Sequence, residues 1–146
     1  MAVTSRARAT WTGDLASGSG SVSGTSSKRF TDVPVTWKAR TEGAAGSTPE
    51  ELLAAAHASC FAMAFSARLA KAGAPPERLE VEAAVTFDNA GGGWGVTTSE
   101  LTVRGAAKGV DAAKFRELAE DAKENCPISK ALKGNVRLAV KAELAP

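Results

Sequence analysis

The chain has 146 residues, 44% of them apolar and 23% charged, and its 18 basic and 16 acidic residues nearly cancel. This length is typical of one domain, and the apolar content excludes a disordered tail or a fibre. Thirty residues are Ala, whereas the larger Leu, Ile, Val and Phe together number only 27. The core therefore has little bulk to bury, which favours an oligomer in which a second subunit shares it.

The charge pattern and the first residues of the sequence bear on binding partners and on the cellular compartment. No run of Lys and Arg reaches five and the net charge is +2, so we expect no nucleic-acid partner. The first 13 residues lack the apolar stretch of a signal peptide. The longest apolar segment, between Glu51 and Arg68, is interrupted by His57, Ser59 and Ser66, and is predicted to be too short and too polar to span a bilayer. We expect a cytoplasmic protein with reduced thiols and no membrane partner.

The first third of the chain is predicted to form strands. Apolar and polar residues roughly alternate over 3–12, which predicts a half-buried strand. The Gly- and Ser-rich stretch 14–27 predicts hairpin connections with one weak strand. Apolar residues around Pro34 predict an edge strand or an extended lead-in, because Pro cannot donate to a ladder. Residues 38–46 are predicted to form a loop.

A long helix follows, and it is the clearest element in the sequence. Thr48 is placed to be an N-cap, with Pro49 at the first helical position and Glu51 at the third, which together form a capping box. The Ala- and Leu-rich run 52–72 ends at Gly73. Such a helix is about 36 Å long. Since it is apolar nearly all round over its first half, we expect it to be buried on most faces.

The remainder alternates between strand and helix patterns. Runs 79–87 and 96–104 predict a hairpin with a glycine-rich loop, and Asp111 is placed to cap a helix that ends near residue 125. A short helix is predicted from Cys126-Pro127 to Leu132, and 136–144 alternates as a closing strand. The order of elements predicts an α+β fold in a single domain over residues 1–146.

The two cysteines are the candidates for chemistry. Cys60 lies in the middle of the long helix and Cys126 at the start of a short one. Taken alone, each is typical of a small buried hydrophobe; a helix start, however, favours a thiolate, and the pair indicates redox work. Their separation excludes a CxxC motif, and a single histidine makes a four-ligand zinc site hard to build. We expect no metal and no cofactor.

Two segments carry a family resemblance. STPEELLAAAHASCF at 47–61 and CPISKAL at 126–132 resemble the OsmC/Ohr family of thiol peroxidases, and more closely its OsmC branch, osmotically inducible protein C. The likeness extends over nearly the whole chain, including WTGD at 11–14. It implies antiparallel strands packed around a long buried central helix, in an intertwined homodimer.

The resemblance also implies an activity and a set of site residues. Organic hydroperoxides would be reduced through a sulfenic acid on Cys60, which Cys126 resolves to a disulfide. An external thiol, such as the dithiol of a lipoylated protein, would then restore both cysteines. An arginine and a glutamate assist in the family, and by position these match Arg40 and Glu50.

Physical chemistry adds a requirement to this scheme. Burial raises the pKa of a thiol in the middle of a helix, so a cation must offset it. The helix start at Thr48 is about 18 Å from Cys60, which makes Arg40 the nearest candidate in sequence and Lys38 the next. Glu50 is placed to hold the guanidinium in a bidentate pair, although near a helix start it is also explained as a carboxylate that the helix dipole favours.

Helix geometry then predicts a composite site. Glu50 and Cys60 are ten residues apart, which in a straight helix separates them by about 15 Å along the axis and roughly 80° in facing. They cannot form one compact site within a single helix unless Arg40 spans most of that gap. We therefore expect Arg40 and Glu50 to reach Cys60 across a dimer interface.

Two other functions fit the sequence less well. One is a non-enzymatic stress protein that binds a small apolar ligand, with incidental cysteines. The other is an acyl-transfer enzyme in which His57 acts as the base for Cys60, although no oxyanion motif accompanies the pair. For a peroxidase, an apolar pocket would favour a substrate with a greasy tail; its candidate walls, which are also core candidates, are Phe61, Met63, Phe65 and Ile128.

Overall fold

The computed structural model describes residues 1–146, and the chain divides into two compact units, Met1–Leu52 and Leu53–Pro146. We refer to them as the N-terminal unit and the C-terminal unit. The boundary falls inside the long helix α2, Pro49–Lys71. The single domain expected over 1–146 therefore stays a prediction.

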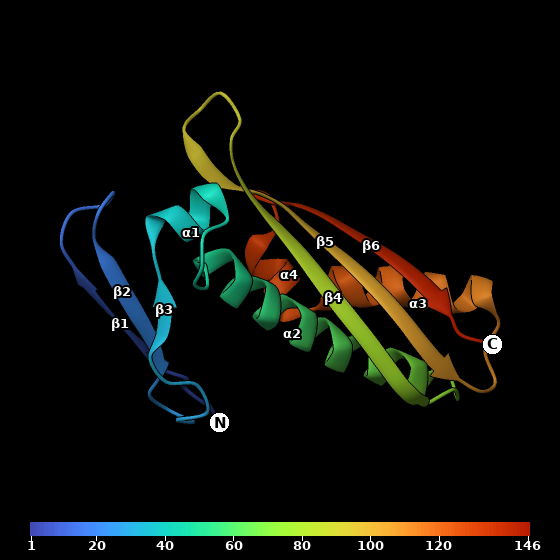
Figure 1. Ribbon diagram of the computed structural model, residues 1–146. Coiled ribbons are helices and arrows are strands. Elements are labelled where there is room, and N and C mark those ends of the chain that lie inside the picture. Colours follow the sequence, from blue (N-terminus) through green and yellow to red (C-terminus); the bar gives the residue numbers. More distant parts are fainter. The chain divides into compact units, whose positions relative to one another are not determined.

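The N-terminal unit contains a three-stranded antiparallel sheet in the order β1-β2-β3 (Figure 1). Its strands are β1 (Ala7–Thr12), β2 (Ser19–Gly24) and β3 (Val33–Val35). The predicted edge strand is confirmed, since β3 lies at the edge of the sheet and so tolerates Pro34. The expected half-burial of the first strand is wrong: every residue of β1 is exposed, because no element of this unit covers the strand.

The loop predicted for 38–46 is also wrong, because a short helix, α1 (Trp37–Glu42), occupies most of it. Thr36 caps this helix, with its side-chain oxygen accepting from the Ala39 N–H at 3.0 Å. Gly43 ends it in the left-handed region at φ 67°. Threonine before and glycine after six residues was a readable signal, and it places Arg40 on a fixed helical turn.

The start of α2 has the predicted cap. The Thr48 hydroxyl oxygen accepts from the Glu51 N–H at 3.0 Å. The second half of the capping box differs, since the Glu51 carboxylate accepts from the Ser47 hydroxyl at 2.9 Å. Glu51 thus holds the chain that leads into the helix, and the neighbouring Glu50 is left for another partner.

The C-terminal unit contains a second three-stranded sheet, in the order β4-β5-β6 (Figure 1). The predicted hairpin is confirmed: β4 (Pro76–Asn89) and β5 (Trp94–Ala107) pair antiparallel, with Val81 opposite Val103. Both strands extend beyond the alternating runs that predicted them. The last strand, β6 (Arg137–Leu144), begins one residue after its predicted start.

The pairing of β6 corrects the expectation of antiparallel strands throughout. β6 runs parallel to β5, with Val140 opposite Leu101. Parallel neighbours need a crossover connection, and here α3 (Ala112–Asn125) and α4 (Pro127–Leu132) provide it. Asp111 caps α3 as predicted, accepting from the Lys114 N–H at 2.8 Å. The crossover carries Cys126 between its two helices.

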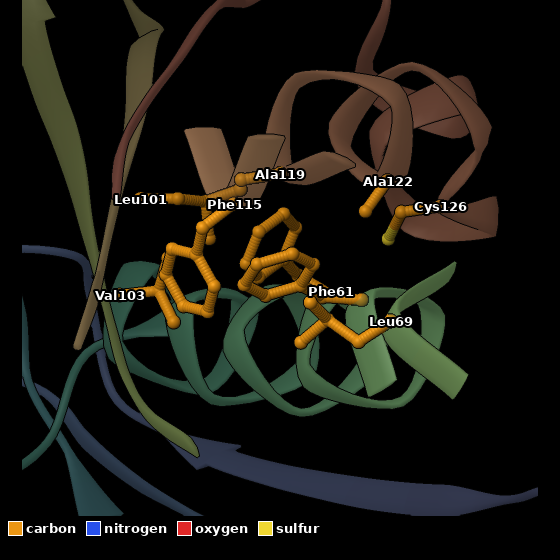
Figure 2. Close-up of a cluster of buried hydrophobic side chains, with 9 residues drawn as sticks. Phe61, Leu69, Leu101, Val103, Phe115, Ala119, Ala122 and Cys126 are labelled. Carbon is orange, nitrogen blue, oxygen red and sulfur yellow. The ribbon is translucent and has the colours of Figure 1, made fainter. Parts of the chain in front are cut away.

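The core of the C-terminal unit lies between α2, α3 and one face of the second sheet (Figure 2). The Phe65 ring sits 5.5 Å from that of Phe61 and 4.8 Å, edge to face, from that of Phe115. Gly105 leaves room for this packing, because a Cβ there would lie 2.8 Å from the Phe115 ring. Three aromatic rings thus supply much of the bulk that the Ala-rich composition lacks.

Burial of α2 differs from expectation. Phe61, Phe65 and Leu69 are fully buried, but Met63 is 69% exposed. A face of small or apolar residues is open along the helix: Ala55, Ser59, Met63 and Ala67. The prediction that the helix is buried on most faces is therefore wrong for a single chain, since sheet and α3 cover only one side of it.

The length of α2 corrects a second expectation. By length and composition alone, the 23-residue helix is long and apolar enough to cross a membrane, because it extends beyond the apolar run at both ends. One such helix is weak evidence for a membrane span, since the core helix of a globular protein passes the same test. In α2, three large apolar side chains pack into the core of the C-terminal unit.

Replacing Phe65 tests this account of the core. Phe65→Ala removes the ring at the centre of the aromatic cluster and leaves a cavity, so we expect the free energy of unfolding to fall by about 3–5 kcal/mol. Urea unfolding followed by circular dichroism measures it. Lys71→Ala, an exposed change on the same helix, is the control and should stay within about 0.5 kcal/mol. A loss for Phe65→Ala no larger than that of the control would contradict the packing.

Candidate active site

The structure brings the two cysteines together in the C-terminal unit. Cys126 is the N-cap residue of α4 and is fully buried in the core cluster. Cys60, halfway along α2, is partly exposed and packs against the same cluster. The Cys126 sulfur points from the junction of α3 and α4 towards α2 (Figure 2). Both thiols are free, and they are close enough that Cys126 raises the pKa of Cys60.

The surroundings of Cys60 favour the neutral thiol. Burial is the largest effect and raises the pKa of the Cys60 thiol, and the neighbouring Cys126 raises it further. The backbone N–H of Ile128 acts against them, lowering this pKa by hydrogen bonding to the sulfur. The net effect of these groups is to raise the pKa of Cys60, and no cation is among them. The C-terminal unit thus supplies one donor to the Cys60 sulfur, and ionisation at neutral pH needs a further group.

His57, one helical turn before Cys60, bonds to other partners. Its ring is fully buried, with Nδ1 2.6 Å from the Ser99 hydroxyl and Nε2 2.8 Å from the Ser129 hydroxyl. Burial lowers the pKa of His57, so the ring is neutral, and one nitrogen donates while the other accepts. Both nitrogens are therefore engaged, and His57 is not placed to act as the base of Cys60.

Ser99 and Ser129, which bond to His57 beside the thiols, were not identified from the sequence. A signal for Ser99 was present: it shares the core face of β5 with Leu101 and Val103 and interrupts that apolar face. Ser129 lies two residues after the Cys-Pro pair, and the residue is only 2% exposed. Neither position alone reveals the shared partner, because His57 is 42 and 72 residues away in sequence.

In the N-terminal unit, Arg40 and Glu50 form the expected ion pair. Arg40 Nη2 lies 2.6 Å from Glu50 Oε1, and Arg40 Nε lies 3.0 and 3.1 Å from the two carboxylate oxygens. The Glu50 side chain is 8% exposed and that of Arg40 29%. The cap at Thr36 sets the helical turn that carries Arg40, and the cap at Thr48 sets the turn that carries Glu50. Two capped helix starts thus fix a charged, bidentate contact.

An apolar groove of about 380 Å³ lies beside this ion pair within the N-terminal unit. It is lined by Trp11, Leu15, Val35, Thr36, Trp37, Arg40 and Pro49. The interpretation of Phe61 and Phe65 as core residues first is confirmed, since both are fully buried, whereas Met63 is exposed. Large aromatic side chains with one guanidinium therefore make the better candidate surface for an apolar ligand with a polar end.

Each pair is thus assembled within one unit: the ion pair in the N-terminal unit and the thiols in the C-terminal unit. Lys38, the alternative cation, is exposed on α1. No group of three or more His, Cys, Asp or Glu side chains is arranged to hold a metal ion. The groups available for chemistry are therefore the two thiols, the Ile128 N–H beside Cys60, and the Arg40 guanidinium paired with Glu50.

Comparison with known proteins finds a matching family and several relatives. The sequence model of the OsmC-like protein family matches residues 40–141. The chain is 38% identical to the peroxiredoxin OsmC of Escherichia coli (strain K12) over 138 residues, which is 94% of this chain and 96% of the relative. It is 33% identical over 95 residues to the organic hydroperoxide resistance protein of Xanthomonas axonopodis pv. citri (strain 306), covering 64% of this chain and 65% of the relative.

A solved structure agrees with these sequence matches. The crystal structure of the organic hydroperoxide resistance protein OhrB of Bacillus subtilis superposes with a TM-score of 0.67 at 29% identity, covering 94% of this chain and 98% of that one. The mixed arrangement of sheets and helices described above is therefore shared with it.

Burial of His57 predicts a pH dependence of stability. The pKa of His57 in the folded chain is below its usual 6.5, so below about pH 6.5 the unfolded chain binds more protons than the folded one. We therefore expect the free energy of unfolding to be highest above that pH and to fall as the pH drops from 7 to 5. Urea titrations across this range measure it.

His57→Gln is the control for this pH dependence. His57 is the only histidine in the chain, and carboxylates titrate mostly below this range. The variant should therefore be less stable at pH 7 but show a flatter stability profile between pH 5 and 7. A profile as steep as that of the unmodified chain would show that another group is responsible.

Proposed function

The chain belongs to the OsmC family, and on that premise we propose that it is a thiol-dependent peroxidase that reduces organic hydroperoxides to alcohols. The observation that carries the proposal is the meeting of Cys60 and Cys126 in one cluster, from elements 66 residues apart in sequence. The peroxiredoxin OsmC and organic hydroperoxide resistance relatives support the same reaction class.

The reaction begins at Cys60. Its thiolate attacks the terminal oxygen of the hydroperoxide, the O–O bond breaks, and the alkoxide leaves and takes up a proton to become the alcohol. Cys60 is now a sulfenic acid. The Cys126 thiol attacks its sulfur, a disulfide forms, and water leaves. An external dithiol then reduces the disulfide by two thiol exchanges and is itself oxidised to a disulfide.

Arg40 is the proposed activator of Cys60. A guanidinium stays charged when it is partly buried, and near the sulfur it would stabilise both the thiolate and the alkoxide that leaves. The bidentate bond to Glu50 fixes its orientation. The groove of Trp11, Leu15 and Trp37 beside it suits the apolar tail of an organic hydroperoxide, because each buried methylene contributes about 0.8 kcal/mol.

The protein acts in this proposal as an intertwined homodimer. A single chain leaves the Met63 face of α2 open and β1 exposed along its whole length, and its core has few large side chains. Pairing two chains through these surfaces would turn α2 into a buried central helix and supply the missing burial. It would also let Arg40 and Glu50 of one subunit serve Cys60 of the other.

Counting thiols tests the reaction. Cumene hydroperoxide in stoichiometric amount should remove both free thiols together, and dithiothreitol should return them. In Cys126→Ser the first oxidation should remain, but excess peroxide should drive Cys60 to the sulfinic acid, because nothing resolves the sulfenic acid. Mass spectrometry of intact protein measures each state.

Cys60→Ser is the matched control, since it keeps the shape of the side chain and removes the attacking sulfur. It should show no turnover and no oxidation of Cys126 by stoichiometric peroxide. Retention of both thiols in the unmodified protein would instead favour a ligand-binding protein, and stable acylation of Cys60 by an ester would favour the acyl-transfer alternative.

Mixing two inactive variants tests the shared site. Cys60→Ser and Arg40→Met should each turn over hydroperoxide far more slowly than the unmodified protein. Refolded together in equal amounts, they should regain about a quarter of its activity, because about half of the dimers are mixed and each mixed dimer carries one intact composite site. If Arg40 serves Cys60 of its own chain, the mixture regains nothing.

A further inference from the structure

The buried triad Ser99–His57–Ser129 joins three elements of the C-terminal unit. His57 lies on α2, Ser99 on β5 and Ser129 on α4. All three residues are at most 2% exposed, and no buried side-chain polar atom in the chain lacks a hydrogen-bond partner. A buried polar group that is fully bonded costs little, whereas one that loses its partner is strongly destabilising. The triad therefore holds its three elements at one spacing.

The bond to Ser129 fixes more than one residue. Ser129 lies three positions after Cys126, and the turn between them is closed by the Lys130 N–H, which donates to the Cys126 carbonyl at 3.0 Å. On the other side, the Cys126 N–H donates to the Ala122 carbonyl at 2.8 Å. Fixing Ser129 thus fixes the backbone of Cys126 and Ile128 as one short rigid segment.

This segment carries both groups that face Cys60. Cys60 and Ile128 both pack against the core cluster that contains Cys126, and the Ile128 N–H is close enough to the Cys60 sulfur to lower its pKa. On α2, His57 and Cys60 are separated by one helical turn and so lie on the same face. The two contacts between the helices are therefore parallel: imidazole to Ser129, and sulfur to Ile128 and Cys126. Packing alone needs no imidazole here, since an apolar ring fills such a space without polar partners.

We propose that His57 is a positioning residue, which through Ser129 holds the start of α4 so that the Ile128 N–H and the Cys126 thiol stay against Cys60. The proposal rests on the thiol peroxidase function for the disulfide step. The donor contact to Cys60 is independent of it. The neutral imidazole acts through geometry: it accepts no proton in the reaction and touches no reacting atom.

Two properties of the thiols follow from this role. When the Ser129 hydroxyl is absent, the start of α4 is free to move away from α2. Cys60 then loses the donor that stabilises its thiolate, so its pKa rises. The sulfenic acid also waits longer for Cys126, because the reacting sulfurs are no longer held together. A residue that serves only stability changes neither property while the chain remains folded.

The first experiment measures the Cys60 pKa from thiolate absorbance at 240 nm, in a Cys126→Ser background where Cys60 is the single thiol. Ser129→Ala in this background should raise the pKa. Ser99→Ala deletes the other hydroxyl on the same ring and should raise it less, because the bond to Ser129 remains. Leu144→Ala removes core contacts at the end of β6 far from Ser99, and it should lower stability without moving the pKa.

The second experiment keeps both cysteines and follows the conversion of sulfenic acid to disulfide after one equivalent of cumene hydroperoxide. We expect Ser129→Ala to slow this step by about tenfold or more, and Leu144→Ala to leave it unchanged. If Ser129→Ala does not fold, Ser129→Thr and Ser129→Val replace it, since they have the same shape and only Thr keeps the hydroxyl. Thr should then behave as the unmodified chain does, and Val should not.

The outcomes separate the two proposals. If Ser129→Ala is folded and less stable but keeps both the pKa and the rate of the unmodified chain, the positioning role is wrong. If the unmodified chain itself forms no disulfide with peroxide, the proposed function fails. The titration at 240 nm, which needs no peroxide, still tests the contact between α4 and Cys60 in that case.

Discussion

The structure depends on how α2 packs against α3 and the second sheet, because this contact determines where Cys60 lies. Phe61 and Phe65 hold one side of the helix against Phe115 and the core face of β5. Cys60, beside Phe61, is thereby placed against the cluster that contains Cys126. The same burial that brings the thiols together raises the pKa of Cys60. A reactive Cys60 thiolate therefore requires polar groups close to the sulfur within these apolar surroundings.

Elements of secondary structure position each of the polar groups discussed above. The crossover between the parallel strands β5 and β6 delivers Cys126 and the Ile128 N–H, and His57 ties that crossover to α2. In the N-terminal unit, Thr36 and Thr48 cap the two helices that carry Arg40 and Glu50. In the proposed dimer, the Arg40–Glu50 pair of one subunit serves the thiols of the other. Such a dimer would also account for the thin core and the open face of α2.

Much of this was readable in the sequence, where local rules apply. Capping residues predicted α2 and α3, and alternation predicted the hairpin of β4 and β5. The pairing of Arg40 with Glu50 followed from the family resemblance. Errors arose where the determinant was not local. The direction of β6 depends on the crossover, and the exposure of β1 and α2 depends on what packs on them. The triad at His57 joins residues 42 and 72 positions apart, which no pattern in one segment shows.

The most direct test of the central claim is a peptide map of the oxidised protein. The chain is treated with one equivalent of cumene hydroperoxide, alkylated, digested without reductant and examined by mass spectrometry, with the intact mass recorded in parallel. The account predicts one linked pair of peptides that contain Cys60 and Cys126, in a protein of single-chain mass under denaturing conditions. Unlinked peptides, with both thiols alkylated or with Cys60 linked only to Cys60 of another chain, would contradict it.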